Sequence, residues 1–139
     1  MTSLDLTASD LPRVFTPAEA AEILRVIGLE SKAHLRPSEL TQIEMRKLEL
    51  ARAMAARPKL LISDEAMAGL SSAEVDDILA ILFRLNGEGI TIIMIEHIMR
   101  AVMRFSERIV VLDAGERIAE GTPDEIVRNP AVEKAYLGE

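Results

Sequence analysis

The chain has 139 residues, of which 49% are hydrophobic and 28% are charged, a balance typical of one globular domain rather than a disordered chain. Its formal net charge is -7 and it contains no cysteine, which excludes disulfides and thiolate chemistry and disfavours a nucleic-acid partner. No apolar run reaches the roughly 18 residues that a membrane-spanning helix needs. The start, MTSLDLTASD, lacks the basic and apolar regions of a secretory signal.

Helical segments are predicted mainly from their start signals. A serine or threonine followed three residues later by glutamate forms a capping box, and proline is favoured in the first helical turn. A glycine after the last apolar position is a typical helix end. These signals and the helical spacing of apolar residues predict six helices, from Thr16 to Gly28, over 44–56, from Ser71, over 98–105, from Thr122 and from Asn129.

Short apolar runs between the helices predict three strands, at 59–63, 90–96 and 108–113. The run ITIIMIE at 90–96 is nearly continuous in apolar and β-branched residues, the pattern of a strand that is buried on both faces. A turn at 114–116 leads from the third strand into RIAEG. Strands separated by helices indicate an α/β domain built around a parallel sheet.

Two acids and a histidine follow the first two predicted strands. Asp64 and Glu65 end the run LLISDE, and His97 follows ITIIMIE. Ligands of open α/β sheets bind at the carboxyl ends of the strands, where an acid can hold hydrated Mg²⁺ and its neighbour can orient or deprotonate a water. The alternatives are structural: solvated acids that cap the next turn, and a histidine that only ends a strand. His34 has no such placement and is interpreted as structural.

Several runs of the sequence, taken in order, resemble one protein family. LLISDE and AGLSSAE are followed by TIIMIEH, ERIVVLDAGERIAEGTP and a terminal NPAVEKAYLGE. Together they resemble the ATP-binding subunits of ABC transporters, and the ending and IEHIMRAVM are most similar to the subunits of branched-chain amino acid importers. The resemblance covers 17–139, leaves 1–16 as an unmatched N-terminal segment, and implies a P-loop NTPase-like parallel sheet with flanking helices.

The resemblance implies roles for five positions. Asp64 matches the Walker B aspartate that helps to hold Mg²⁺, and Glu65 matches the catalytic glutamate that polarises the attacking water. His97 matches the switch histidine that contacts the γ-phosphate. Thr41 and Glu44 fall in the signature loop, which binds nucleotide in the family. The implied cofactors are therefore ATP and Mg²⁺.

Two departures from the family bear on activity. LTQIE at 40–44 aligns with the signature Leu-Ser-Gly-Gly-Gln, so side chains replace the glycines that let backbone amides approach a phosphate, and Glu44 places an anion beside a polyanion. No phosphate loop of the pattern G-x-x-x-x-G-K-[ST] is present. In the family that loop follows a strand between those at 90–96 and 108–113. We therefore expect an incomplete sheet with an exposed apolar edge and marginal stability.

Three functional hypotheses follow. The first is the C-terminal portion of an ATP-hydrolysing subunit of an importer for branched-chain or related amino acids. The second is a half that a separate chain with the phosphate loop completes, and the third is a non-catalytic interaction module or decayed remnant. The family implies permease subunits in the membrane and a second ATP-binding subunit as partners, and a location on the cytoplasmic face of the plasma membrane. Hydrolysis by the isolated chain is not expected.

Overall fold

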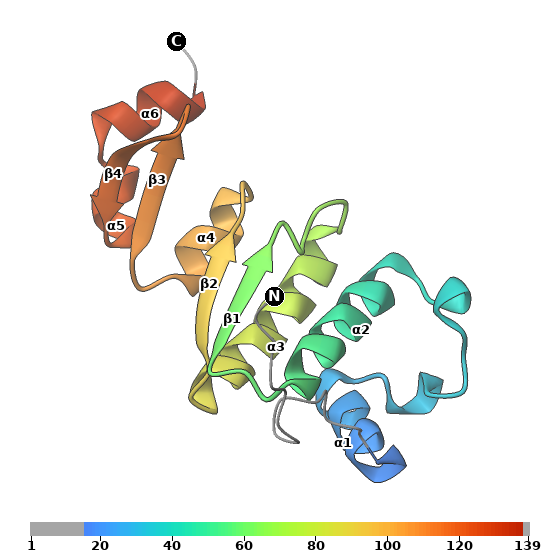
Figure 1. The fold of residues 1–139 in the computed structure, drawn as a ribbon. Helices are drawn as coiled ribbons and strands as arrows, with labels where there is room; N and C mark the ends of the chain where they lie inside the picture. The colour runs from blue at the N-terminus through green and yellow to red at the C-terminus, as the bar shows by residue number, and fades with distance from the viewer. Residues whose placement is uncertain (1–15, 138–139) are drawn as a thin grey trace, which may run out of the picture. The chain divides into compact units, whose positions relative to one another are not determined.

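The structure is a computed structural model that describes residues 16–137. Contacts divide the chain into two compact units, Met1–Lys59 and Leu60–Glu139. Helices and strands follow the predicted alternation (Figure 1). The first unit holds α1 (Pro17–Ile27), the 3₁₀ turns η1 (Glu30–Lys32) and η2 (Pro37–Glu39), and α2 (Gln42–Ala55). The second unit holds β1 (Leu60–Asp64), α3 (Ser72–Gly87), β2 (Thr91–Ile95), α4 (Met99–Phe105), β3 (Ile109–Asp113), β4 (Glu116–Gly121), α5 (Pro123–Val127) and α6 (Pro130–Leu137).

The first unit is built on α1 and α2, and α1 has the boundaries that the sequence predicts. The Thr16 hydroxyl accepts the N–H of Glu19 at 3.2 Å, and the Glu19 carboxylate accepts the N–H of Thr16 at 3.0 Å. Gly28 ends the helix with φ of 80°, a left-handed conformation that suits glycine. Arg57, two residues after α2, lies 3.5 Å from the Glu19 carboxylate, so an ion pair joins α1 to the segment that follows α2.

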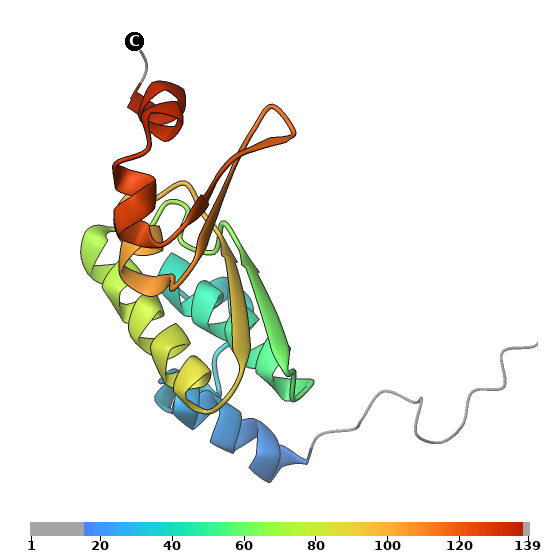
Figure 2. The same cartoon turned by 90° about the vertical axis from the view of Figure 1, so that its left-hand side faces the viewer.

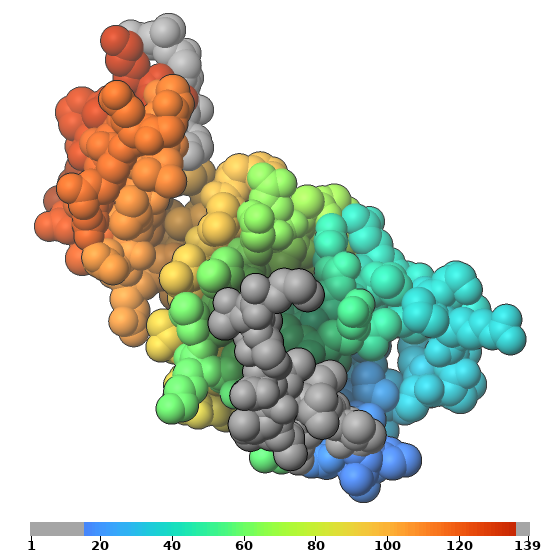
Figure 3. Space-filling view, viewed as in Figure 1, coloured from blue at the N-terminus to red at the C-terminus, as the bar shows by residue number. Residues whose placement is uncertain are grey.

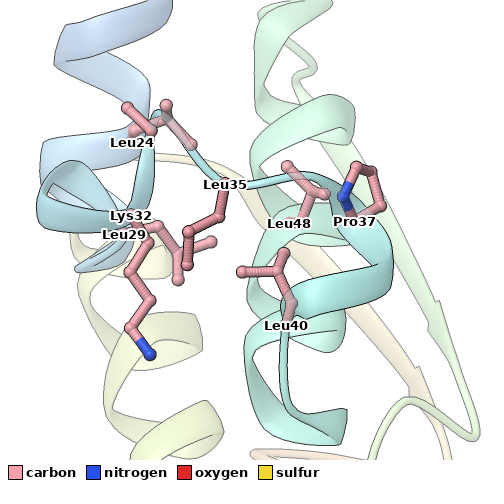
Figure 4. Close-up of a pocket in the computed structure, with 8 residues that line it drawn as sticks. Leu24, Leu29, Lys32, Leu35, Pro37, Leu40 and Leu48 are labelled. Carbon is pink, nitrogen blue, oxygen red and sulfur yellow. The ribbon is translucent and has the colours of Figure 1, made fainter.

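A small apolar cavity lies between α1, the loop that follows it and α2. Leucine side chains from these three segments lie around it (Figure 4). Its volume of about 70 Å³ is far below the roughly 300–1,000 Å³ of a site for an organic ligand. The cavity is therefore a packing gap of this helical unit and not a nucleotide site.

The second unit contains a parallel pair, β1 and β2, with Ile62 opposite Ile93 and Asp64 opposite Ile95. Helix α3 lies along one face of this pair (Figures 1 and 2). Leu61 and Ser63 of β1 are buried, and the residues that alternate with them, Leu60, Ile62 and Asp64, are exposed. The buried side of α3 presents six apolar residues: Val75, Ile78, Leu79, Ile81, Leu82 and Leu85.

Strands β3 and β4 form a separate antiparallel hairpin, as the predicted turn requires. Ala114 and Gly115 at the turn both have positive φ, 46° and 85°. One face of the hairpin packs with α5 and α6 in a cluster that Val102 and Met103 of α4 also contact. The buried members of this cluster are Ile109, Val111, Ala119, Ile126 and Val132.

The predicted burial of the strand at 90–96 on both faces is wrong. In β2, Thr91, Ile93 and Ile95 are exposed, while the alternate residues are partly buried. The physical reason is that α3 covers one face and no described residue among 16–137 forms a layer over the other. The expected break in the sheet is confirmed, because β2 pairs only with β1 and β3 pairs only with β4 within the described residues.

Helix α4 has seven residues and is held to α3 by charged and aromatic contacts. The Asp76 carboxylate of α3 accepts hydrogen bonds from Arg100 at 3.1 Å and from Arg104 at 2.6 Å. The rings of Phe83 and Phe105 lie with their centroids 5.0 Å apart, within the range of a favourable aromatic pair. In the part of the chain that the structure describes, no helix has both the length and the apolar character needed to cross a bilayer.

Ser71→Ala should lower the free energy of unfolding by about 1 kcal/mol, because it removes the N-terminal cap of α3. The Ser71 hydroxyl accepts the N–H of Glu74 at 3.4 Å. Urea unfolding followed by circular dichroism measures the change. Ser72→Ala, at the exposed first helical residue, is the matched control and should stay within about 0.5 kcal/mol of the unmodified chain. Equal losses in the two variants would contradict the capping role.

Candidate functional site

The carboxyl ends of β1 and β2 bring together two of the predicted site residues. The N–H of Glu65 donates to the carbonyl of Ile95 at 2.9 Å, which extends the β1–β2 ladder by one step. His97 follows two residues after that carbonyl. Its Nδ1 lies 3.7 Å from Oε1 of Glu65, and both side chains are 62% exposed. An acid and an imidazole thus face solvent side by side, a suitable position for orienting a water or a ligand oxygen.

The backbone turns sharply at Glu65, immediately after β1. Its φ of 45° is in the left-handed region, which is unfavourable for a residue with a side chain. Such a conformation costs on the order of 1–3 kcal/mol and persists only where the surroundings hold it in place. The hydrogen bond from the Glu65 N–H to Ile95 is one such restraint.

A second restraint comes from Glu96, a residue that the sequence analysis placed only at a strand end. Its Oε1 accepts the N–H of Met67 at 3.0 Å, and the Met67 side chain is completely buried. These contacts anchor the loop that carries Glu65. The other carboxylate oxygen of Glu96 is buried and has no hydrogen-bond partner among residues 16–137. In the sequence, Glu96 is recognisable only as the acid directly before His97. That position does not reveal that Glu96 accepts a hydrogen bond from the Met67 backbone.

Asp64 is the predicted metal ligand and lies exposed at the end of β1. Within the described residues, no three acidic, histidine or cysteine side chains gather into a group that could hold a metal ion. Asp64 therefore offers a single carboxylate ligand, and the described residues do not supply a complete set of protein ligands for a metal ion. That donor set fits Mg²⁺ only where waters and phosphate oxygens fill the other positions, which is the usual way proteins bind this ion. The described residues provide no phosphate cradle of their own.

Thr41 and Glu44, the two remaining predicted site residues, lie in the first unit at the start of α2. The Glu44 carboxylate accepts the N–H of Thr41 at 2.9 Å and forms an ion pair with the ammonium of Lys32. This cap explains why α2 begins at Gln42, two residues before the predicted start at 44. It also means that the Thr41 amide is already engaged by a carboxylate of the chain itself.

We predict that the pKa of Glu44 depends on its contact with Lys32. The hydrogen bond from Lys32, followed by that from the Thr41 N–H, holds the pKa of Glu44 below its usual value. Because the pKa is lower in the folded state, the stabilisation is present above the unfolded value of about 4.3 and is lost as the pH falls through the folded value. Lys32→Met should move the pKa of Glu44 upward, measured by NMR titration of its carboxyl carbon. Lys59→Met is the control and should leave that pKa unchanged; an equal shift in both would contradict the pairing.

Comparison with known proteins supports the family resemblance. Residues 116–139 match the family described as branched-chain amino acid ATP-binding cassette transporter. The chain is 43% identical over 121 residues to the high-affinity branched-chain amino acid transport ATP-binding protein BraF of Pseudomonas aeruginosa, covering 86% of this chain and 48% of that protein. The chain is a homologue of ABC transporter ATP-binding subunits. The LivG protein of Escherichia coli K12, with the same printed function, is 42% identical over 121 residues.

Solved structures of ABC ATP-binding cassettes have the same fold. An ATP-binding cassette in its ADP conformation superposes with a TM-score of 0.81 at 29% identity, covering 88% of this chain and 50% of that one. CbiO1 of Clostridium perfringens, part of an ABC transporter complex, superposes with a TM-score of 0.74 at 27% identity over 84% and 47% of the two chains. The predicted P-loop NTPase-like fold is confirmed. The chain spans about half the length of these ABC relatives.

Proposed function

We propose that this chain forms the C-terminal part of the ATP-binding and ATP-hydrolysing subunit of an ABC importer for branched-chain or related amino acids. The observation that carries the proposal is the pairing of Glu65 with His97 at the ends of adjacent parallel strands, at 3.7 Å. The 43% identity to BraF, a branched-chain amino acid transport protein, supports this class of substrate. Transmembrane permease subunits and a second ATP-binding subunit are the proposed partners. The proposed location is the cytoplasmic face of the plasma membrane.

Each site residue has a role in this proposal. Asp64 contributes the carboxylate for Mg²⁺, Glu65 orients and deprotonates a water, and His97 contacts the terminal phosphate. Thr41 and Glu44, at the start of α2, belong to the signature segment that contacts nucleotide. ATP supplies the phosphoryl group when bound, and the phosphate cradle comes from sequence outside these 139 residues.

A non-catalytic interaction module is the second candidate, and the start of α2 favours it. The Thr41 amide is occupied by Glu44, whose charge is paired with Lys32, so an internal carboxylate stands where a phosphate would be recognised. Loss of a phosphate loop, which provides several charge-assisted hydrogen bonds of about 1.5–3 kcal/mol each, weakens nucleotide affinity by orders of magnitude. In this reading the helices pack on a partner without binding ATP.

Titration with ATP and Mg²⁺, followed by calorimetry, separates these functions. The chain is titrated alone and together with the part of BraF that the match leaves out, about half of that protein. The proposed function predicts little affinity for the chain alone and clear Mg²⁺-dependent binding for the combination, weakened by Asp64→Asn. Asp77→Asn, on the exposed side of α3, is the control and should bind as the unmodified chain does. Absence of binding in the combination supports the interaction module instead.

A further inference from the structure

Three successive residues, the last of β2 and the two that follow it, contact the loop after β1. The carbonyl of Ile95 accepts the Glu65 N–H at 2.9 Å. Oε1 of Glu96 accepts the N–H of Met67 at 3.0 Å. Nδ1 of His97 then lies 3.7 Å from Oε1 of Glu65. The segments after β1 and β2, green and yellow-orange in Figure 3, lie side by side at the surface.

The loop after β1 consists of two overlapping turns that share Met67. The Ala68 N–H donates to the carbonyl of Glu65 at 3.2 Å, and the Leu70 N–H donates to that of Met67 at 3.2 Å. Met67 is completely buried, so water does not reach its own N–H. A buried N–H needs an acceptor within the protein, and the Glu96 carboxylate provides it.

The Glu96 carboxylate does not face the side on which Glu65 and His97 are open to solvent. Exposure alternates along the chain here, because Ile95 and His97 are exposed and Glu96 between them is partly buried. One oxygen of Glu96 is engaged by Met67, and the other is buried without a hydrogen-bond partner among residues 16–137. Any effect of Glu96 on a ligand at the exposed pair therefore passes through the loop.

We propose that Glu96 is a positioning residue: by holding the Met67 amide, it fixes the loop and keeps the Glu65 carboxylate beside His97. The backbone of Glu65 has a φ of 45°, a conformation that persists only where contacts hold it. Displacing a catalytic group by about 1 Å can lower a rate about 10²-fold, so this contact matters for hydrolysis although Glu96 does not touch the ligand. The link to hydrolysis rests on the proposed function, whereas the placement of Glu65 does not.

The contact with Met67 depends on the length of the Glu96 side chain rather than on its charge. Glu96→Gln keeps the length and offers an amide oxygen to the Met67 N–H. The other carboxylate oxygen has no partner in the described part of the chain, so an amide nitrogen in its place breaks no hydrogen bond there. Glu96→Asp keeps the charge but withdraws the carboxylate by one methylene group, and Glu96→Leu removes the acceptor. The first variant should keep the contact, and the other two should lose it.

Amide hydrogen exchange and nuclear Overhauser effects, measured by NMR on the chain alone, test the placement. Glu96→Leu and Glu96→Asp should speed exchange of the Met67 amide by about 10-fold or more, as expected for loss of a hydrogen bond to a charged group. They should also remove the Overhauser effect between the Glu65 and His97 side chains, while Glu96→Gln keeps both signals. Glu107→Leu is the matched control at an exposed acid and should keep both.

Two results on the chain alone would overturn the proposal, with folding of each variant verified by circular dichroism. The first is equal exchange of the Met67 amide in Glu96→Leu and Glu107→Leu. The second is loss of both signals in Glu96→Gln but not in Glu96→Asp, which would make charge and not length the requirement. If Glu96→Leu does not fold, the comparison of Glu96→Asp with Glu96→Gln decides.

The rate of ATP hydrolysis, measured on the assembly of this chain with the part of BraF that the match leaves out, tests the consequence. Glu96→Leu should lower the rate about 10²-fold, and Glu96→Gln should leave it close to that of the unmodified assembly. Combined with Glu65→Gln, Glu96→Leu should cause no further decrease, because it acts through Glu65. A decrease by the same factor in both backgrounds indicates a merely structural role and overturns the proposal. An assembly that does not hydrolyse ATP contradicts the proposed function, and the NMR measurements on the chain alone then decide the placement of Glu65.

Discussion

Leu82→Ala is expected to lower the free energy of unfolding by about 2–5 kcal/mol, because it removes a completely buried side chain from α3 and leaves a cavity beneath the sheet. Domains are stabilised by only about 5–15 kcal/mol in total. Within its described residues, this chain leaves one face of a two-stranded sheet uncovered. We therefore expect its free energy of unfolding to lie near the low end of that range. The loss should therefore leave much of the protein unfolded at room temperature.

Urea unfolding followed by circular dichroism measures the effect, and Leu112→Ala is the matched control. It is the same substitution at a residue that is 61% exposed on β3, and it should change the free energy of unfolding by no more than about 0.5 kcal/mol. If the two variants lose the same stability, the packing of α3 on the sheet is not what holds the second unit together. A cooperative thermal transition of the unmodified chain at high temperature would likewise contradict the expected marginal stability.

Glu65→Gln is expected to lower the rate of ATP hydrolysis by the assembly of this chain with the part of BraF that the match leaves out. The expected decrease is about 10²–10⁴-fold, the usual contribution of a general base. The amide keeps the size of the side chain but cannot accept a proton from a water. Binding of ATP should remain close to that of the unmodified assembly, since Glu65 is proposed to act on the water and not to hold the nucleotide. Phosphate release and a parallel binding titration give the two quantities separately.

Glu107→Gln is the control for this prediction, because Glu107 is an exposed acid in the loop before β3. It should leave turnover unchanged. Equal turnover in the Glu65→Gln and unmodified assemblies would remove Glu65 from the proposed chemistry, and a parallel loss of ATP affinity would assign it to binding.

The helix starts were predictable from the sequence because their signals are local. Each capping box at Thr16, Ser71 and Thr122 lies within four residues, and the structure contains all three. The start of α2 was predicted two residues late, since the cap that Glu44 makes with the Thr41 N–H was read as part of a nucleotide loop. The ion pair between Glu44 and Lys32 joins residues that are 12 positions apart, and no short pattern reveals it.

The candidate site was predictable only in part. Polar residues after apolar runs placed Asp64, Glu65 and His97 at strand ends, and the parallel register then brought Glu65 to His97. The anchoring of the Glu65 loop by Glu96 and Met67 was not predicted, because it joins positions 29 residues apart. The burial of β2 was overestimated because composition reports how apolar a strand is and not which layer covers it.

The contacts of α4 impose an order on its formation. A helix of seven residues is too short to persist in water by itself. It depends on Asp76 and Phe83, which belong to α3 and leave the ribosome earlier. During synthesis, we therefore expect the segment at 98–105 not to hold a stable helix until α3 is in place. A folding defect in α3 would leave this stretch open to proteolysis, even in a polypeptide whose own α4 sequence is unchanged.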